Sequence, residues 1–300
     1  MGQLDASTVT FGIKTTPMRA GYADILRVWQ EADALPEIAD AWLWDHLMAV
    51  SGPPDSPVLE GWTLLSALAA RTRRLGLGLL VTSNRLRAPA LLGKMASTVD
   101  AVSGGRLVMG LGVGGTRQPG DPAANPAVAE YAGYGIDLVP PAEGLERLRE
   151  TIAVLRGMWD EEVFDYRGKF TVLTGNRNAP KPVRPGGPPL LLAGWGPRML
   201  RLVAEHADIW NVPGPPHNSV AWAADRARAL DAACAAVGRD PREIVRSVQY
   251  IVDYGDPAKD RAALAELIAE GFGHLVLSLR APYPEGVAEW LVREIVRPLS

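Results

Sequence analysis

The sequence predicts an α/β protein with a (β/α)8 TIM barrel, in which eight parallel strands close into a cylinder surrounded by helices. Short, nearly continuous apolar segments recur along the chain, as expected for parallel strands that are covered on both faces. Between them lie segments whose apolar residues recur every three and four positions, the period of an amphipathic helix. Eight strand-helix pairs in 300 residues match this barrel in number and size. A doubly wound parallel sheet is the alternative.

The expected strands are apolar segments bounded by glycine, proline or charged residues. They cover residues 9–14, 41–44, 75–82, 106–112, 189–193, 207–211, 245–252 and 274–279. Polar residues and glycines follow most of their C-terminal ends. In a barrel these ends converge on one face, where ligands bind.

The expected helices alternate with these strands. They cover residues 22–34, 61–71, 89–102, 143–159, 198–205, 220–237, 258–270 and 285–296. Pro89 and Pro197 suit a first helical turn, and Gly238 follows a helix end, so local capping signals agree with the periodicity.

Two segments interrupt the alternation and account for inserted loops and a short hairpin. Residues 116–126 are too rich in proline and glycine for a helix or a strand, which predicts a long loop after the fourth strand that acts as a lid or pocket wall. Residues 162–173 alternate on both sides of Arg167-Gly168-Lys169, which predicts a hairpin, and an irregular stretch follows over 174–188.

Composition limits the classes of partner. The chain is 47% hydrophobic and 22% charged, which is typical of a globular protein, and we expect one domain over residues 1–300. Its net charge of -3, without a block of basic residues, argues against nucleic acid and anionic membranes and favours a small molecule. No apolar segment reads as a signal or membrane span, so a cytoplasmic protein is expected. Cys234 has no partner for an internal disulfide and is expected in the core.

Several common site types are disfavoured. The four histidines lack the H-x-x-x-H spacing of zinc sites, and no G-x-S-x-G elbow of a serine hydrolase is present. Residues 110–115 match G-x-G-x-x-G after a strand, but the breakers that follow cannot begin the helix that holds a pyrophosphate. These glycines would instead let the backbone approach a planar ring.

Asp45 and His46 form the clearest candidate site. They end the apolar strand 41–44 abruptly, at the position where α/β proteins place ligands and chemistry. An imidazole titrates near neutral pH, so His46 beside a carboxylate can exchange a proton or orient a polar ring. In the alternative interpretation, Asp45 caps the next turn and His46 is an ordinary loop residue.

A second candidate follows the fifth strand and suits a phosphate. Gly194 and Gly196 permit close approach, while Pro197 at a first helical turn leaves neighbouring N–H groups pointing outward, and Arg198 adds charge. Trp195, between the two glycines, is expected to face a ligand. A turn that only joins the strand to the helix is the alternative.

Six motifs together resemble the bacterial luciferase-like (LLM class) family of flavin- and coenzyme F-420-dependent oxidoreductases, and in particular its deazaflavin branch. They are FGIKT at 11–15, WLWDH at 42–46, LEGWTL at 59–64, LGLGLLVT at 75–82, SGGRL at 103–107 and AGWGPR at 193–198. The resemblance extends from about Phe11 to Trp210 and more weakly to the C-terminus.

The resemblance implies a barrel with an insertion after strand seven or nearby, a homodimer, and a flavin or deazaflavin at the C-terminal mouth. It also implies a non-proline cis peptide between Leu80 and Val81, and a role for His46 with Asp45 in contacting the ring or in proton transfer. The residues that it assigns to the cofactor are Leu80, Val81, Thr82, Asn84, Gly112, Gly114, Gly194, Trp195, Gly196, Pro197 and Arg198.

The resulting hypothesis is hydride transfer between coenzyme F-420 and a small organic substrate. A separate F-420 reductase would supply the reduced cofactor. One alternative is a monooxygenase that takes reduced FMN from a separate flavin reductase. Relatives often carry an acidic proton donor after strand four, where this chain has Thr116-Arg117-Gln118-Pro119. Because of that departure, Glu130 is considered as the donor, and a non-catalytic flavin-binding relative is the third hypothesis.

Overall fold

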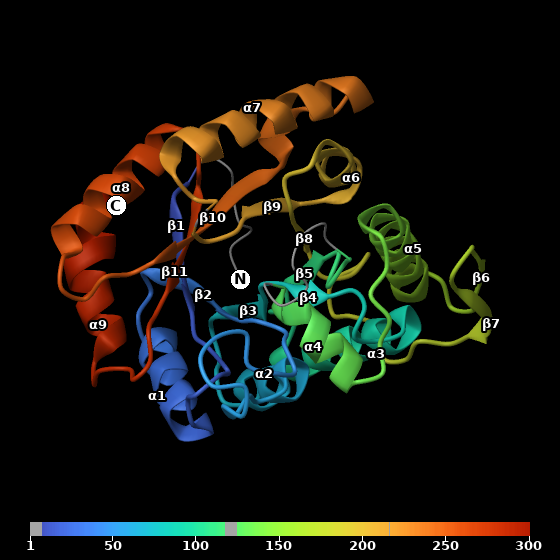
Figure 1. The fold of residues 1–300 in the computed structure, drawn as a ribbon, viewed down its shortest axis with the longest axis horizontal. Helices are drawn as coiled ribbons and strands as arrows, with labels where there is room; N and C mark the ends of the chain where they lie inside the picture. The colour runs from blue at the N-terminus through green and yellow to red at the C-terminus, as the bar shows by residue number, and fades with distance from the viewer. Residues whose placement is uncertain (1–7, 118–124, 216) are drawn as a thin grey trace.

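The sheet of this protein is a parallel barrel. The computed structural model describes residues 8–117, 125–215 and 217–300. Its main sheet has the strand order β3-β2-β1-β11-β10-β9-β8-β5-β4, and every pairing in it is parallel (Figure 1). The strands are β1 (Thr10–Lys14), β2 (Ile38–Leu43), β3 (Gly76–Leu79), β4 (Thr82–Ser83), β5 (Met109–Gly112), β8 (Leu190–Ala193), β9 (Ile209–Val212), β10 (Val245–Ile251) and β11 (His274–Ser278).

The two outermost strands in this order, β3 and β4, are the two halves of one barrel strand. They are separated only by Leu80 and Val81, whose peptide bond is cis, as the resemblance implied. Beside β3, Leu77 donates its N–H to the carbonyl of Arg106 at 3.0 Å and accepts from the N–H of Val108 at 2.9 Å, so β3 also pairs with the segment leading into β5. The barrel is therefore closed and eight-stranded, and the doubly wound alternative is wrong.

Helices surround the barrel, following most strands as the periodicity predicts (Figure 1). They are α1 (Tyr22–Asp33), α2 (Gly61–Ala69), α3 (Pro89–Ser103), α5 (Pro141–Asp160), α6 (Pro197–His206), α7 (Val220–Val237), α8 (Pro257–Ala269) and α9 (Val287–Leu291). Their bounds agree with the predicted ranges to within a few residues, except that α9 continues in a π-helical turn, Val292–Val296. Among the described residues, no helix is both long and apolar enough to cross a bilayer.

One helix was not predicted. α4 (Pro126–Gly133) begins where the sequence predicted the end of a loop, and of that loop residues 118–124 lie outside the described part of the chain. The Asn125 side chain caps α4 by accepting the N–H of Ala127 at 3.1 Å, and proline occupies the first helical position. The many proline and glycine residues at 116–126 led to the prediction of a loop, although Asn125-Pro126 is itself a helix-start signal.

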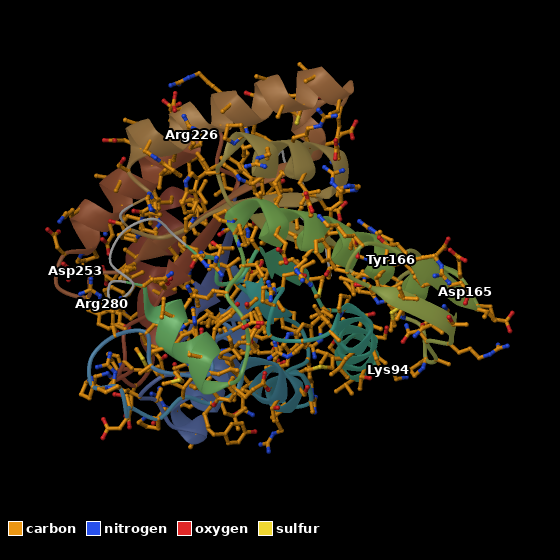
Figure 2. All side chains as sticks on the ribbon, turned by 45° about the vertical axis from the view of Figure 1, so that its right-hand side comes forward. Lys94, Asp165, Tyr166, Arg226, Asp253 and Arg280 are labelled. Carbon is orange, nitrogen blue, oxygen red and sulfur yellow. The ribbon has the colours of Figure 1, made fainter. Side chains whose placement is uncertain are left out.

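The predicted hairpin is present as β6 (Phe164–Arg167) and β7 (Val172–Asn176), paired antiparallel. It lies between α5 and β8 in the sequence, and Figure 2 labels two of its residues, of which Asp165 is exposed while Tyr166 packs against the Val154, Met158 and Phe164 cluster. The expected insertion after the seventh barrel strand is wrong, because only residues 252–256 join β10 to α8. The insertion follows the fourth barrel strand instead.

The core has two layers, one between barrel and helices and one inside the barrel. The inner layer contains Trp42, Leu80, Val108, Leu191, Ile209, Val245 and Val276. Trp42 is fully buried there, and its indole N–H donates to the carboxylate of Asp40 at 2.5 Å. Cys234 is buried in the outer layer, as predicted. Because side chains fill the barrel interior, a ligand is confined to the mouth.

Gly78 tests how tightly this interior is packed. A Cβ there would lie 2.5 Å from the carbonyl oxygen of Val108 and 2.7 Å from the Trp42 ring. Gly78→Ala is therefore expected to lower the free energy of unfolding by about 1–3 kcal/mol in urea denaturation. Gly214→Ala is the matched control, since its nearest neighbour is 3.9 Å away, and it should leave stability nearly unchanged. Equal effects in the two variants would contradict the packing account.

Candidate functional site

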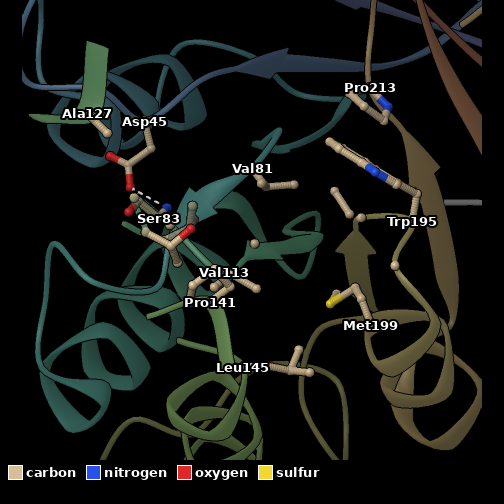
Figure 3. A pocket seen from close by; sticks show the side chains of 18 of the residues that line it. Asp45, Val81, Ser83, Val113, Ala127, Pro141, Leu145, Trp195, Met199 and Pro213 are labelled. Carbon is tan, nitrogen blue, oxygen red and sulfur yellow. Dashed lines mark hydrogen bonds between the residues drawn. The ribbon is translucent and has the colours of Figure 1, made fainter. Parts of the chain in front are cut away.

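A cavity of about 860 Å³ opens at the C-terminal mouth of the barrel. It is lined by the ends of β2, β4, β5 and β8 together with α4 and the starts of α5 and α6 (Figure 3). Every predicted site residue except Asn84 lines it. Asn84 is buried beside it, with its backbone N–H donating to the carbonyl of Gly112 at 3.2 Å. The structure thus brings together residues that are distant in the sequence.

Asp45 is buried at the edge of this cavity. Its carboxylate accepts two hydrogen bonds from Arg87, at 2.8 and 3.0 Å, and one from the backbone N–H of Ser83 at 2.9 Å (Figure 3). Burial raises the pKa of the Asp45 carboxyl, and the Arg87 and Ser83 donors oppose that rise. The bond to Ser83 ties the end of β2 to β4.

Arg87 extends this network to α2. Its guanidinium also contacts Glu60, whose carboxylate caps α2 by accepting the N–H groups of Trp62 and Thr63 at 3.1 and 2.7 Å. One buried cation therefore links a helix N-terminus, a strand end and the third barrel strand. Among the described residues, Asp45 makes no hydrogen bond to His46, so its contacts are those of a positioning residue.

His46 pairs with Glu130 on α4. Its Nδ1 lies 3.1 Å from Glu130 Oε2, while Glu130 Oε1 accepts the backbone N–H of Leu47 at 2.5 Å. Burial favours a raised pKa for Glu130, but the bonds from His46 and the Leu47 and Met48 N–H groups outweigh it and lower that pKa. An ionised Glu130 accepts from Nδ1–H and leaves Nε2 as the nitrogen available to a ligand.

The His46 ring is held on one side and open on the other. It packs edge-on against Trp44, with ring centroids 5.1 Å apart and an interplanar angle of 68°. Its side chain is 38% exposed, whereas that of Glu130 is 3% exposed. His46 is therefore a fixed, accessible imidazole on the cavity wall, as a proton-transfer residue requires.

Tyr131 fixes α4 against the strand ends. Its hydroxyl lies 2.7 Å from Ser83 Oγ and accepts the backbone N–H of Gly115 at 2.6 Å. Burial raises the pKa of this phenol, so it stays a neutral hydrogen-bonding group. The helix that carries Glu130 is thereby locked to β4 and to the glycines after β5.

The turn before α6 forms the opposite wall of the cavity, facing Asp45 across Val81 (Figure 3). Gly194 has a φ of +146°, which requires glycine, and its carbonyl accepts the Trp210 indole N–H at 2.8 Å. Trp195 is 41% exposed and lines the cavity. A Cβ on Gly196 would meet no atom within 4 Å, so its backbone faces open space.

Within the described ranges, no group of three or more His, Cys, Asp or Glu side chains is placed to hold a metal ion. The site instead offers an imidazole, a glycine turn at a helix start and apolar walls. Thr82 adds a hydroxyl that is fully buried beside the cavity and has no hydrogen-bond partner among the described residues.

Comparison with known proteins identifies the family. The family model described as luciferase-like monooxygenase matches residues 7–288. The chain belongs to the luciferase-like family. The predicted family and the barrel fold of its members are both confirmed.

Several curated proteins that are similar to this luciferase-like protein are named as reductases. It is 32% identical over 226 residues to the phthiodiolone/phenolphthiodiolone dimycocerosates ketoreductase of Mycobacterium sp. (strain JLS), with 74% of this chain and 55% of that protein covered. The chain thus spans about half the length of the curated relatives it matches.

Two solved structures share its fold. The coenzyme F-420-dependent tetrahydromethanopterin reductase of Methanopyrus kandleri superimposes with a TM-score of 0.77 at 17% identity, covering 98% of this chain and 100% of that one. An F-420-dependent secondary alcohol dehydrogenase in complex with an F-420–acetone adduct gives a TM-score of 0.80 at 15% identity, covering 98% and 99%. At these identities the likeness shows the fold.

The sequence provided only a weak indication that Glu130 is a proton donor. Its pairing with His46 depends on α4, which was not predicted, and on the distant tie between Tyr131 and Ser83. Lys14 and Gln249, which line the mouth beyond Trp44, were also not assigned a role. Lys14 follows the rule that the last residue of a barrel strand faces the site, and that rule could have identified it.

The Asp45–Arg87 pair yields a stability prediction. Arg87→Met leaves the buried Asp45 carboxylate without its cation, which is expected to cost about 3–5 kcal/mol of unfolding free energy. The double variant Asp45→Asn with Arg87→Met should recover part of that loss in urea denaturation. Arg242→Met, which removes an exposed ion pair with Asp240, is the control and should have little effect. Additive losses at Asp45 and Arg87 would contradict the assigned coupling.

Proposed function

We propose that this luciferase-like protein is an oxidoreductase that binds coenzyme F-420 in the 860 Å³ cavity and transfers a hydride between it and a small organic substrate. The observation that carries the proposal is the fixed His46–Glu130 pair on the cavity wall opposite the Gly194 turn. The ketoreductase and F-420-dependent names of its relatives and neighbours support it. A homodimer, and a separate reductase that supplies reduced cofactor, are part of the same proposal.

The cavity fits such a cofactor. Its volume lies within the range of about 300–1,000 Å³ that holds cofactor-sized ligands. The orphaned Thr82 hydroxyl offers a hydrogen bond to a polar ring edge, and Val81 presents an apolar face between the two walls (Figure 3). Gly196 leaves room for a phosphate at the start of α6, where the first-turn N–H groups of Arg198 and Met199 have no acceptor within the helix.

When bound, the deazaflavin supplies the hydride chemistry, and the protein supplies binding and electrostatics. Glu130 holds His46 by Nδ1 and stabilises a positive charge on the ring. His46 Nε2 then gives a proton to the substrate oxygen as a carbonyl is reduced, or removes one as an alcohol is oxidised. Asp45 and Arg87 keep β4 and its apolar face in position.

A titration of the purified protein tests the cofactor. Quenching of tryptophan fluorescence by F-420 should give micromolar affinity, because Trp195 and Trp44 both line the cavity, and FMN should bind more weakly. Trp195→Leu should reduce the quenching, while Trp290→Leu on α9 serves as the control. Micromolar FMN binding without F-420 binding would reject this cofactor and favour a reduced-FMN monooxygenase.

The proton-transfer role is tested by variants of the pair. His46→Ala should lower turnover of simple ketones or enones by about 10²–10⁴-fold, the usual contribution of a positioned acid or base, with a small change in F-420 affinity. Glu130→Gln should lower turnover in the same direction. His206→Ala, on α6, is the control and should retain activity. If His46→Ala weakens binding as much as turnover, His46 only binds the cofactor.

A further inference from the structure

The mouth of the barrel has a second compartment that the proposed cofactor site does not use. It has a volume of about 440 Å³ and is lined by the ends of β1, β10 and β11 and by the loop after β9. Trp44, Trp195, Pro213 and Gln249 line both compartments, so the two are adjacent. The larger compartment occupies the half of the mouth formed by β2, β4, β5 and β8, and this one occupies the other half.

Lys14, the last residue of β1, supplies the charge of this second compartment. Its ammonium donates to Gln249 Oε1 at 2.5 Å. Gln249 is fixed in turn, because its Nε2 donates to Asn211 Oδ1 at 3.1 Å and Asn211 Nδ2 donates to Ser247 Oγ at 2.8 Å. A chain of neutral side chains from β10 and β9 therefore holds the Lys14 amine in one place.

The Lys14 charge has no countercharge in the described part of the chain. Its one side-chain hydrogen bond there goes to a neutral amide, and the described residues that line this compartment include no aspartate or glutamate. Burial lowers the pKa of Lys14 to about 8. Lys14 is half-buried, and an ammonium partly withdrawn from water without an anionic partner is unfavourable, so proteins usually pair such charges. The missing partner is therefore expected to be supplied by a ligand.

The rest of the compartment fits a substrate with an apolar body. Trp44 and Trp195 provide aromatic walls, and Ile251 and Leu279 provide aliphatic surface. His217 stacks on Trp195, with ring centroids 4.6 Å apart and an interplanar angle of 33°, and adds a polar edge. An apolar wall with one fixed cation selects a ligand that combines a hydrophobic group with an oxyanion.

We propose that this second compartment binds the substrate, and that Lys14 pairs with an oxyanion of the substrate, a carboxylate or a phosphate. The assignment rests on the proposed function, because it takes the larger compartment to be occupied by the cofactor. The substrate class is then an organic acid or phosphate ester with an apolar portion against Trp44 and Trp195. Lys14 is a specificity-determining residue that contacts substrate at a group other than the reacting carbon.

The test uses the full chain without cofactor and follows tryptophan fluorescence. Benzoate and phenyl phosphate are the anionic probes, and benzamide is the neutral match for benzoate. Benzoate or phenyl phosphate should bind the wild type at least about tenfold more tightly than benzamide, and Lys14→Met should abolish that preference. Whichever of benzoate and phenyl phosphate binds more tightly indicates whether the substrate oxyanion is a carboxylate or a phosphate. Lys14→Arg should retain part of the preference.

Two controls keep the result specific. Lys259→Met, on α8, removes the same charge elsewhere and should bind like the wild type. Benzamide binding by Lys14→Met shows that the compartment has remained intact. Equal affinity of wild type for benzoate and benzamide, or an unchanged benzoate preference in Lys14→Met, would overturn the assignment.

The pH dependence has a definite sign. Lys14 attracts an anion only while protonated, so benzoate affinity should be high at about pH 6.5 and fall by about pH 9.5, as the pH passes the lowered Lys14 pKa of about 8. The carboxylate stays ionised throughout this range. His217 also faces the compartment, and His217→Gln should preserve the high-pH loss. A benzoate affinity that does not change over this range would contradict a role for Lys14.

A competition experiment between F-420 and benzoate distinguishes the proposed cofactor site from the proposed substrate site. Saturating F-420 should leave the benzoate affinity unchanged, since the two ligands occupy adjacent compartments. Competition between them would overturn the substrate assignment and place the anion of the cofactor at Lys14. If F-420 does not bind but benzoate binds through Lys14, the anion site stands and the proposed function fails.

Discussion

The buried ion pair between Asp45 and Arg87 is the constraint on which the site depends. Asp45 joins the end of β2 to β4 through the Ser83 N–H, and Arg87 connects both to the cap of α2 through Glu60. A carboxylate in this position is retained only if its charge is compensated, so the pair fixes three elements at once. Asp45 makes its hydrogen bonds within this network, whereas His46 pairs with Glu130.

Asp45 and His46 are adjacent in the sequence but make different contacts. Asp45 positions the wall of the cavity, and His46 presents an accessible imidazole to it. The Tyr131 hydroxyl, bonded to Ser83 and Gly115, brings Glu130 to the same place from α4. The larger compartment then has one wall that carries the accessible His46 imidazole and an opposite wall, from Gly194 to Arg198, where Gly196 faces open space. The second compartment adds a cation at Lys14.

The sequence predicted the barrel and the positions of its strands because both signals are local. Continuous apolar runs mark buried parallel strands, and helices show their period. Residues at strand ends, such as His46 and Trp195, were identified because the barrel places all such ends on one face. Family resemblance added the Leu80–Val81 peptide, but its expected insertion after strand seven was wrong.

What the sequence did not predict depends on contacts between distant segments. α4 lies beside a segment rich in breakers, and it is held in place by Tyr131 and by the Glu130–His46 contact, neither of which has a local signature. The Asp45–Arg87 pairing likewise spans 42 positions, so Asp45 gave no sign of its positioning role. The isolation of the Lys14 charge becomes visible only when the surrounding strand ends are assembled.

A crystal structure of the protein soaked with F-420 tests the central claim most directly. The account predicts the deazaflavin ring in the larger compartment, against Val81 and beside His46, with Nε2 left available to a substrate oxygen. It also predicts the phosphate at the Gly194–Arg198 turn, with the compartment at Lys14 left for substrate. A ring bound beside Lys14, or one that makes no contact with His46, would contradict it.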